Sequence, residues 1–118
     1  MEYTYRSKEP ANTILEVPGR LDALTYAGFE EVLMALFEDE GRGVAIDFTR
    51  VDYISSAGLR ALMRGLKRMK EVQGALALFG VNHNNMEVLR ISGFDKVFSI
   101  FETEADALAS LKDQLKAY

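Results

Sequence analysis

The segment 44-VAIDFTRVDYISSAGLRALMRGLKRMK-70 joins a β-prone run to a helical one, and the predicted fold follows from this junction. Apolar and β-branched residues continue as far as Ile54, and residues 55–58 (SSAG) separate them from the helical pattern. Serine is typical of a helix N-cap, because its side-chain oxygen accepts a hydrogen bond from an unpaired backbone N–H. A cap needs only one hydroxyl, so either Ser55 or Ser56 is available for a second role.

The residues that follow predict an amphipathic helix that begins near Ser56 and ends at Gly74. Its predicted buried stripe consists of Leu59, Leu62, Met63 and Leu66. Its outer surface is basic, and three cations fall at positions i, i+4 and i+7: Arg60, Arg64 and Lys67. Such a stripe is typical of a solvated helix face, and beside a regulated serine it is also a contact surface for an acidic partner.

Working outward from this segment, the sequence predicts strands that alternate with helices. Strands are expected at residues 2–8, 12–18, 43–48, 75–79 and 97–101. Helices are expected around residues 29–37, from residue 56, over 82–93 and after Thr103. The order β-β-α-β-α-β-α-β-α requires parallel neighbours joined by right-handed crossovers. The prediction is therefore an α/β fold in one small domain, residues 1–118, with a mixed, mostly parallel sheet of about five strands and four helices.

The composition excludes several classes of function. The net charge is −4, from 18 acidic and 14 basic residues, which disfavours nucleic acid as the main partner because phosphate binding requires a basic surface. The chain has no cysteine, so disulfides and cysteine-ligated metals are excluded. No apolar run is long enough for a transmembrane helix, and the N-terminus lacks the apolar core of a signal peptide. We therefore expect a cytoplasmic protein without direct membrane insertion.

No catalytic, cofactor or metal site is predicted. The sequence contains neither G-x-x-x-x-G-K-[ST] nor G-x-G-x-x-G, so a standard nucleotide-binding loop is absent. A G-x-S-x-G nucleophile elbow is also missing, and the single histidine, His83, lies in a segment typical of a helix start. Three aspartates lie in the segments that lead to the helices, but their spacing supports no magnesium site: Asp22, Asp47 and Asp52.

The segment 44–70 resembles the signature of STAS domains, the family of bacterial anti-sigma factor antagonists and their relatives. Upstream, 17-VPGRLDALTYAGFEEVL-33 is similar to a second family segment, a Gly-x-Leu-Asp that ends a strand and opens a helix. The tail 80-GVNHNNMEVLRISGFDKVFSIFETEADAL-108 is similar to the family's later helix, glycine turn, short strand and final helix. The first two motifs together make the resemblance specific, and it covers nearly the whole chain.

The resemblance implies a non-enzymatic phosphoprotein that regulates transcription through protein–protein contacts. In that family an unphosphorylated antagonist binds an anti-sigma factor, which is often a serine kinase, and a serine phosphatase resets the antagonist. The acceptor then falls on Ser56, with Ser55 as the alternative, and Asp22 is expected close to it. Ser55 occupies the place of an aspartate that precedes the acceptor in many regulated antagonists, and Arg60 stands where a small residue is common. The expected partner-binding residues are Asp22, Asp52, Ser55, Ser56, Ala57, Gly58, Arg60, Arg64 and Lys67.

A second hypothesis keeps the same family but needs no phosphate. STAS-like domains also serve as constitutive accessory subunits of ABC-type transport complexes, where they dock on an ATPase subunit at the inner face of the membrane. Ser56 would then be only a helix cap and a contact residue. Under either hypothesis we expect a monomer or weak dimer that uses no cofactor.

Overall fold

The computed structural model describes residues 3–118, and its main sheet has five strands in the order β1-β2-β4-β6-β7. The strands are β1 (Thr4–Glu9), β2 (Asn12–Glu16), β4 (Gly43–Asp47), β6 (Ala75–Phe79) and β7 (Ile100–Phe101). β1 pairs antiparallel with β2, and every other neighbouring pair in this sheet is parallel. The predicted mixed, mostly parallel sheet is confirmed. Glu2, which was expected within the first strand, lies outside the described residues.

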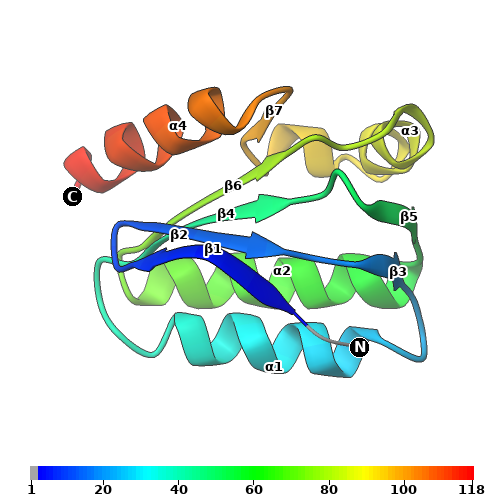
Figure 1. The fold of residues 1–118 in the computed structure, drawn as a ribbon, viewed down its shortest axis with the longest axis horizontal. Coiled ribbons are helices and arrows are strands. Elements are labelled where there is room, and N and C mark those ends of the chain that lie inside the picture. The colour runs from blue at the N-terminus through cyan, green and yellow to red at the C-terminus, as the bar shows by residue number, and fades with distance from the viewer. Residues whose placement is uncertain (1–2) are drawn as a thin grey trace.

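In the described part of the chain, four α-helices and one 3₁₀ turn connect and cover the strands (Figure 1). They are α1 (Tyr26–Leu36), α2 (Ser56–Glu71), α3 (His83–Ile91), the 3₁₀ turn Phe94–Lys96 and α4 (Glu104–Lys116). Helices α1 and α2 pack together on one face of the sheet, and α4 lies on the opposite face over β4 and β6. Within residues 3–118, no helix combines the length and the apolar character needed to cross a bilayer.

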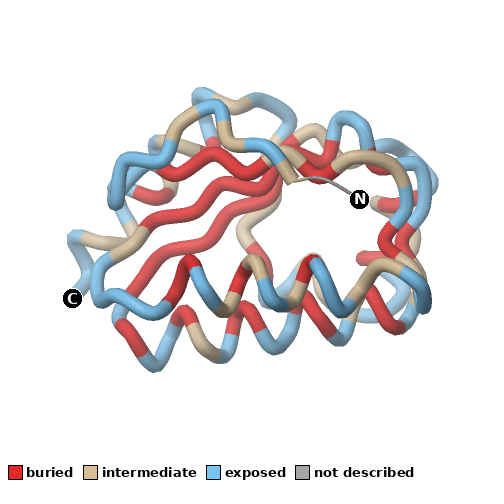
Figure 2. The backbone as a smooth tube through the Cα atoms, turned by 60° about the horizontal axis from the view of Figure 1, so that its bottom comes forward, coloured by how far each residue is buried: buried red, intermediate tan, exposed pale blue. Residues whose placement is uncertain are grey.

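Strands β4 and β6 form the centre of the core, as the apolar runs at 44–46 and 75–79 predict. All five residues of each strand are buried, which is the pattern of strands covered on both faces. Figure 2 shows these strands as buried throughout, whereas the helices are buried only along the side that faces the sheet. On α1 that side consists of Phe29, Leu33 and Leu36.

The buried face of α2 contains more small residues than the hydrophobic pattern indicates. It consists of Ala57, Gly58, Ala61, Leu62, Gly65, Leu66 and Met69. The two helices approach closely, because a Cβ added at Gly65 would lie 2.7 Å from the Leu33 Cδ1 of α1. The prediction that Met63 belongs to the buried stripe is wrong, since this residue is 39% exposed. The hydrophobic pattern predicted large side chains at the contact with α1, whereas the structure has alanine and glycine there.

A second, two-stranded sheet extends the structure beyond the carboxyl ends of β2 and β4. β3 (Gly19–Leu21) follows β2 after Pro18, β5 (Val51–Ile54) follows β4, and the two pair in parallel. Gly19 has φ +71°, a left-handed backbone conformation that glycine adopts without strain and that redirects the chain into β3. The predicted strands 12–18 and 43–48 did not include this extension. It carries residues 55–58, called here the serine loop, because β5 leads directly into α2.

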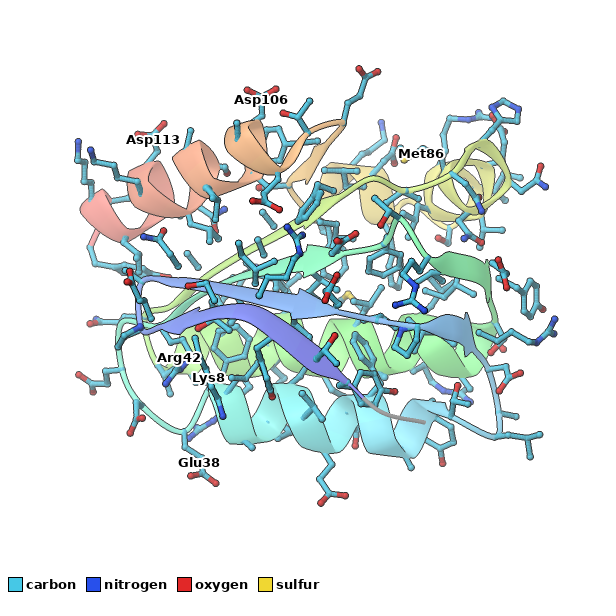
Figure 3. All side chains as sticks on the ribbon, viewed as in Figure 1. Lys8, Glu38, Arg42, Met86, Asp106 and Asp113 are labelled. Atoms are coloured by element: carbon cyan, nitrogen blue, oxygen red, sulfur yellow. The ribbon has the colours of Figure 1, made fainter. Side chains whose placement is uncertain are left out.

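Strand β7 has two residues and pairs only with Leu78 and Phe79, so the first part of the outer edge of β6 has no neighbouring strand. Helix α4 covers this part of the edge. The side chain of Gln114 accepts a hydrogen bond from the Leu76 N–H and donates one to the Leu76 carbonyl, each at 3.0 Å. It therefore continues the hydrogen bonding of the strand edge. In Figure 3, Asp106 and Asp113 of the same helix point away from the sheet, so α4 has one polar and one packed side.

Candidate functional site

Ser55 is the N-cap of α2. Its Oγ accepts a hydrogen bond from the Gly58 N–H at 3.4 Å, and its extended backbone (φ −97°, ψ 176°) is typical of a cap residue. Its own N–H donates to the Leu21 carbonyl of β3 at 2.8 Å. Ser55 is therefore bound both to the helix that it begins and to the neighbouring strand.

Ser56 is the first residue of α2, and it is exposed. Because Ser55 already caps the helix, the Ser56 hydroxyl is not needed for that purpose. The N-terminus of a helix carries a partial positive charge, so an anionic group attached here is stabilised by the helix dipole. A phosphate can be added at this position without breaking the cap.

Ala57 and Gly58 form the buried side of the first turn of α2. Both are buried, and a Cβ added at Gly58 would lie 2.8 Å from the Leu21 carbonyl oxygen. Such a distance is too short for any residue other than glycine unless the backbone shifts. Both were expected to bind the partner. Because they are buried, they contribute by fixing the backbone of the serine loop and do not themselves present a contact surface.

Asp22 follows β3 and organises the turn before α1. Its Oδ2 accepts a hydrogen bond from the Arg20 Nε at 3.1 Å, and its Oδ1 accepts one from the Leu24 N–H at 3.0 Å. The hydrogen bond from Arg20, followed by that from Leu24, holds the pKa of the Asp22 carboxyl below its ordinary value. The Ser55–Leu21 hydrogen bond brings this turn beside the serine loop.

Arg20 and Tyr53 face each other across the two-stranded sheet. They are register partners, and the guanidinium carbon of Arg20 lies 4.7 Å from the centre of the Tyr53 ring. Tyr53 is 42% exposed, and the nearby Leu24 is 92% exposed. The sequence analysis assigned no role to any of these three residues. An aromatic residue on the exposed side of a short strand is the signal that would have indicated Tyr53.

Two asparagines from α3 and its cap bind the other edge of β5. Asn85 is 1% exposed; its side chain accepts a hydrogen bond from the Ile54 N–H at 3.2 Å and donates one to the Val51 carbonyl at 3.0 Å. Asn82 caps α3 and donates to the same Val51 carbonyl at 3.2 Å. The sequence analysis missed Asn85. β5 is thus hydrogen-bonded on both edges immediately before Ser55.

The three cations of the predicted stripe on α2 have different surroundings. Arg64 forms hydrogen bonds of 2.9 and 3.1 Å with the two carboxylate oxygens of Glu30 on α1, so its charge is already paired. Arg60 and Lys67 are exposed and take part in none of the ion pairs found within residues 3–118. Asp52 is exposed on β5. Of the predicted partner-binding residues, Asp52 and Arg60 therefore flank the two serines with exposed charges.

The three aspartates considered for a magnesium site do not form one. Asp47 binds Arg6 through Oδ2 at 2.7 Å and the Thr49 N–H through Oδ1 at 2.8 Å, while Asp22 binds Arg20. In the part of the chain that the structure describes, no three His, Cys, Asp or Glu side chains are grouped to hold a metal ion.

Comparison with known proteins identifies the family of the chain. Residues 4–107 match the family model of the STAS domain. Over 86 residues the chain is 40% identical to BtrV of Bordetella bronchiseptica, named as an anti-sigma factor antagonist, and the match covers 72% of this chain and 74% of that protein. It is 30% identical over 90 residues to the anti-sigma-B factor antagonist of Listeria monocytogenes, covering 76% of this chain and 79% of the relative.

A solved structure shows the same fold. The crystal structure of an anti-sigma factor antagonist from Mycobacterium paratuberculosis superposes with a TM-score of 0.82 at 22% identity, covering 95% of this chain and 94% of that one. The family match and the curated relatives confirm the resemblance found in the sequence. The chain belongs to the STAS domain family and, within it, to the anti-sigma factor antagonists.

Proposed function

We propose that this chain is switched by phosphorylation of Ser56. Anti-sigma factor antagonists are regulatory proteins without enzymatic activity, so the phosphate comes from a partner. The observation that carries the proposal is the different use of two adjacent serines: Ser55 is bound as the helix cap, while Ser56 is exposed in the first turn. In the cytoplasm the unphosphorylated chain binds an anti-sigma factor with serine kinase activity, and a serine phosphatase restores that form.

The docking surface consists of residues 52–58, which run from β5 into the first turn of α2, and the exposed side of α2. A phosphate on Ser56 adds bulk and a charge of about −2 at this surface. Burying that dianion against a partner costs at least about 2 kcal/mol, the scale of losing a central interface group. In the free protein the phosphate is stabilised by the helix N-terminus and by Arg60, one turn along α2. Phosphorylation therefore weakens the complex while the fold stays intact.

Ser55 replaces the aspartate that precedes the acceptor in many antagonists. Serine and aspartate are both good N-caps, so the geometry of the loop does not depend on a charge at this position. The kinase must then recognise the loop through other groups. Asp22 and Asp52 carry the same charge as the missing carboxylate and lie in the segments on either side of the serine loop.

The experiment is phosphorylation by purified serine-kinase anti-sigma factors of the same organism, with ATP, followed by the intact mass of the chain. We expect a gain of one phosphate in the wild type and in Ser55→Ala, and none in Ser56→Ala. Ser55→Ala loses the cap, worth about 0.5–2 kcal/mol, so its fold is checked by thermal melting. Modification that persists in Ser56→Ala refutes the assignment. A complex that forms equally well with phosphorylated chain supports the constitutive accessory role instead.

A further inference from the structure

We infer that Arg20 is a specificity-determining residue whose terminal guanidinium nitrogens pair with a carboxylate of the anti-sigma factor. The inference rests on the proposed function and adds to it a contact outside the serine loop and α2. The surface concerned, called here the Arg20 patch, consists of Arg20 and Tyr53, which are in contact, and of Leu24, whose backbone N–H shares the Asp22 carboxylate with Arg20.

The guanidinium of Arg20 is held in one orientation, with its outer edge free. Asp22 binds only the Nε, at 3.1 Å, and the Tyr53 ring lies 4.7 Å beneath the guanidinium carbon. Within residues 3–118 the two terminal nitrogens have no hydrogen-bond or ion-pair partner, and the side chain is 60% exposed. Terminal nitrogens in this arrangement can donate two parallel hydrogen bonds to a carboxylate. Because the side chain is already ordered, little conformational entropy is lost when it binds.

The rest of the patch has the composition of a protein-binding surface. Tyr53 is 42% exposed and pairs with Arg20 of β3, and Leu24 is 92% exposed and donates its backbone N–H to Asp22. Tyrosine and arginine are the residue types most often found at the energetic centre of interfaces. The hydrogen bond from the Leu24 N–H to Asp22 fixes the backbone that presents the leucine. One carboxylate, that of Asp22, thus orders both the cation and the apolar residue of the patch.

A carboxylate on the partner fits this position better than a phosphate on Ser56. The strand register pairs Arg20 with Tyr53, and Ser56 lies three residues further along the chain. Ser56 lies beyond the end of β5, in the first turn of α2. Asp22 and Tyr53 hold the guanidinium at its own end of the strand. Arg20 therefore lies on β3, next to the strand that leads to the acceptor, where a partner docked on the serine loop contacts it.

The test measures binding of the unphosphorylated chain to the anti-sigma factor that phosphorylates Ser56, by titration calorimetry at low and high salt. We expect Arg20→Gln to weaken binding about tenfold or more, and this difference to shrink as salt screens the ion pair. Arg50→Gln is the matched control, because it removes the same charge from an exposed residue next to β5; its effect should stay below about threefold. In the kinase assay Arg20→Gln should raise KM and leave kcat unchanged, since the contact serves binding alone.

A double-mutant cycle tests whether Asp22 is a positioning residue for Arg20. If Asp22 acts through the arginine, Asp22→Asn weakens binding in the wild type and changes little in the Arg20→Gln background. Additive effects overturn this positioning role, because they show that Asp22 contacts the partner independently. Equal affinities for Arg20→Gln and Arg50→Gln overturn the role of Arg20 while phosphorylation of Ser56 still supports the proposed function. A wild-type chain that no kinase modifies at Ser56 overturns both.

Discussion

Replacing Asn85 by leucine should destabilise the protein, because this side chain binds one edge of β5. Asn85 is 1% exposed, accepts a hydrogen bond from the Ile54 N–H at 3.2 Å and donates one to the Val51 carbonyl at 3.0 Å. Leucine has a similar size but can make neither bond. The only strand that pairs with β5 is β3, on its other edge, so no backbone group replaces the lost partner within the described residues.

The two hydrogen bonds lost in Asn85→Leu differ in their cost to the free energy of unfolding. The Val51 carbonyl keeps a hydrogen bond from Asn82 at 3.2 Å, so its loss is about 0.5–1.5 kcal/mol. The Ile54 N–H becomes an unpaired buried donor, which costs about 1–3 kcal/mol. The apolar surface of leucine recovers part of this cost at about 25 cal/mol per Å². The expected net loss of stability is about 1–3 kcal/mol.

Urea unfolding followed by circular dichroism measures this loss. With a slope of about 1–3 kcal/mol per molar urea, the midpoint should fall by roughly 1 M. Asn84→Ala is the matched control, since it truncates an exposed asparagine on the same helix and should change stability by less than about 0.5 kcal/mol. Equal midpoints for Asn85→Leu and Asn84→Ala would show that the Asn85 hydrogen bonds do not stabilise β5, and would refute the reasoning.

Other positions give further tests. Gln114→Leu removes both hydrogen bonds to Leu76, so we expect urea unfolding to show a loss of stability of about 1–3 kcal/mol. The uncovered edge of β6 should also cause concentration-dependent association, which analytical ultracentrifugation measures. Wild-type behaviour in both experiments would contradict the role of Gln114 at this edge. Gly58→Ala places a methyl group 2.8 Å from the Leu21 carbonyl oxygen, and the melting temperature should fall by the equivalent of about 1–3 kcal/mol; an unchanged Tm would rule out the close approach. The folded-state pKa of Asp22 lies below the ordinary value of 3.8, so its contribution to stability is present above that pH and is lost as pH falls through the lower, folded-state pKa. The stability difference between wild type and Asp22→Asn should therefore be constant from about pH 5 to 8 and decrease only in acid, and a change within the neutral range would contradict this.

Much of the serine loop could be predicted because helix capping depends on neighbouring residues. The junction of a β-prone run with a helical pattern limited the cap to Ser55 or Ser56, and the structure assigns it to Ser55. Arg20 could not be identified in this way, because its position over Tyr53 depends on pairing between strands distant in sequence. The ion pair between Arg64 and α1 is likewise a tertiary contact, and the charge pattern of α2 alone shows Arg64 as free.

The fold could be predicted where residues are buried on both sides. The strand expected at 75–79 is β6 as observed, because its uninterrupted apolar sequence matches a strand at the centre of the sheet. β3 has three residues and was missed, and β7 has only two where a strand was expected over 97–101. Segments this short show no clear period, and their pairing partners define their bounds. Met63 was misplaced for a related reason. Hydrophobicity favours large side chains, whereas the contact between α1 and α2 selects small ones such as Gly65.

The way in which β5 is held indicates how a phosphate on Ser56 can act. β3 binds one edge of β5, Asn85 binds the other, and the close approach at Gly58 fixes the first turn of α2. A switch that rearranged this loop would have to break buried hydrogen bonds that cost about 1–3 kcal/mol each. The interaction of an exposed anion with a helix N-terminus supplies only about 0.3–1 kcal/mol. That interaction alone is too weak to drive a rearrangement, so under the proposed function the phosphate acts by steric and electrostatic exclusion of a partner from a rigid surface.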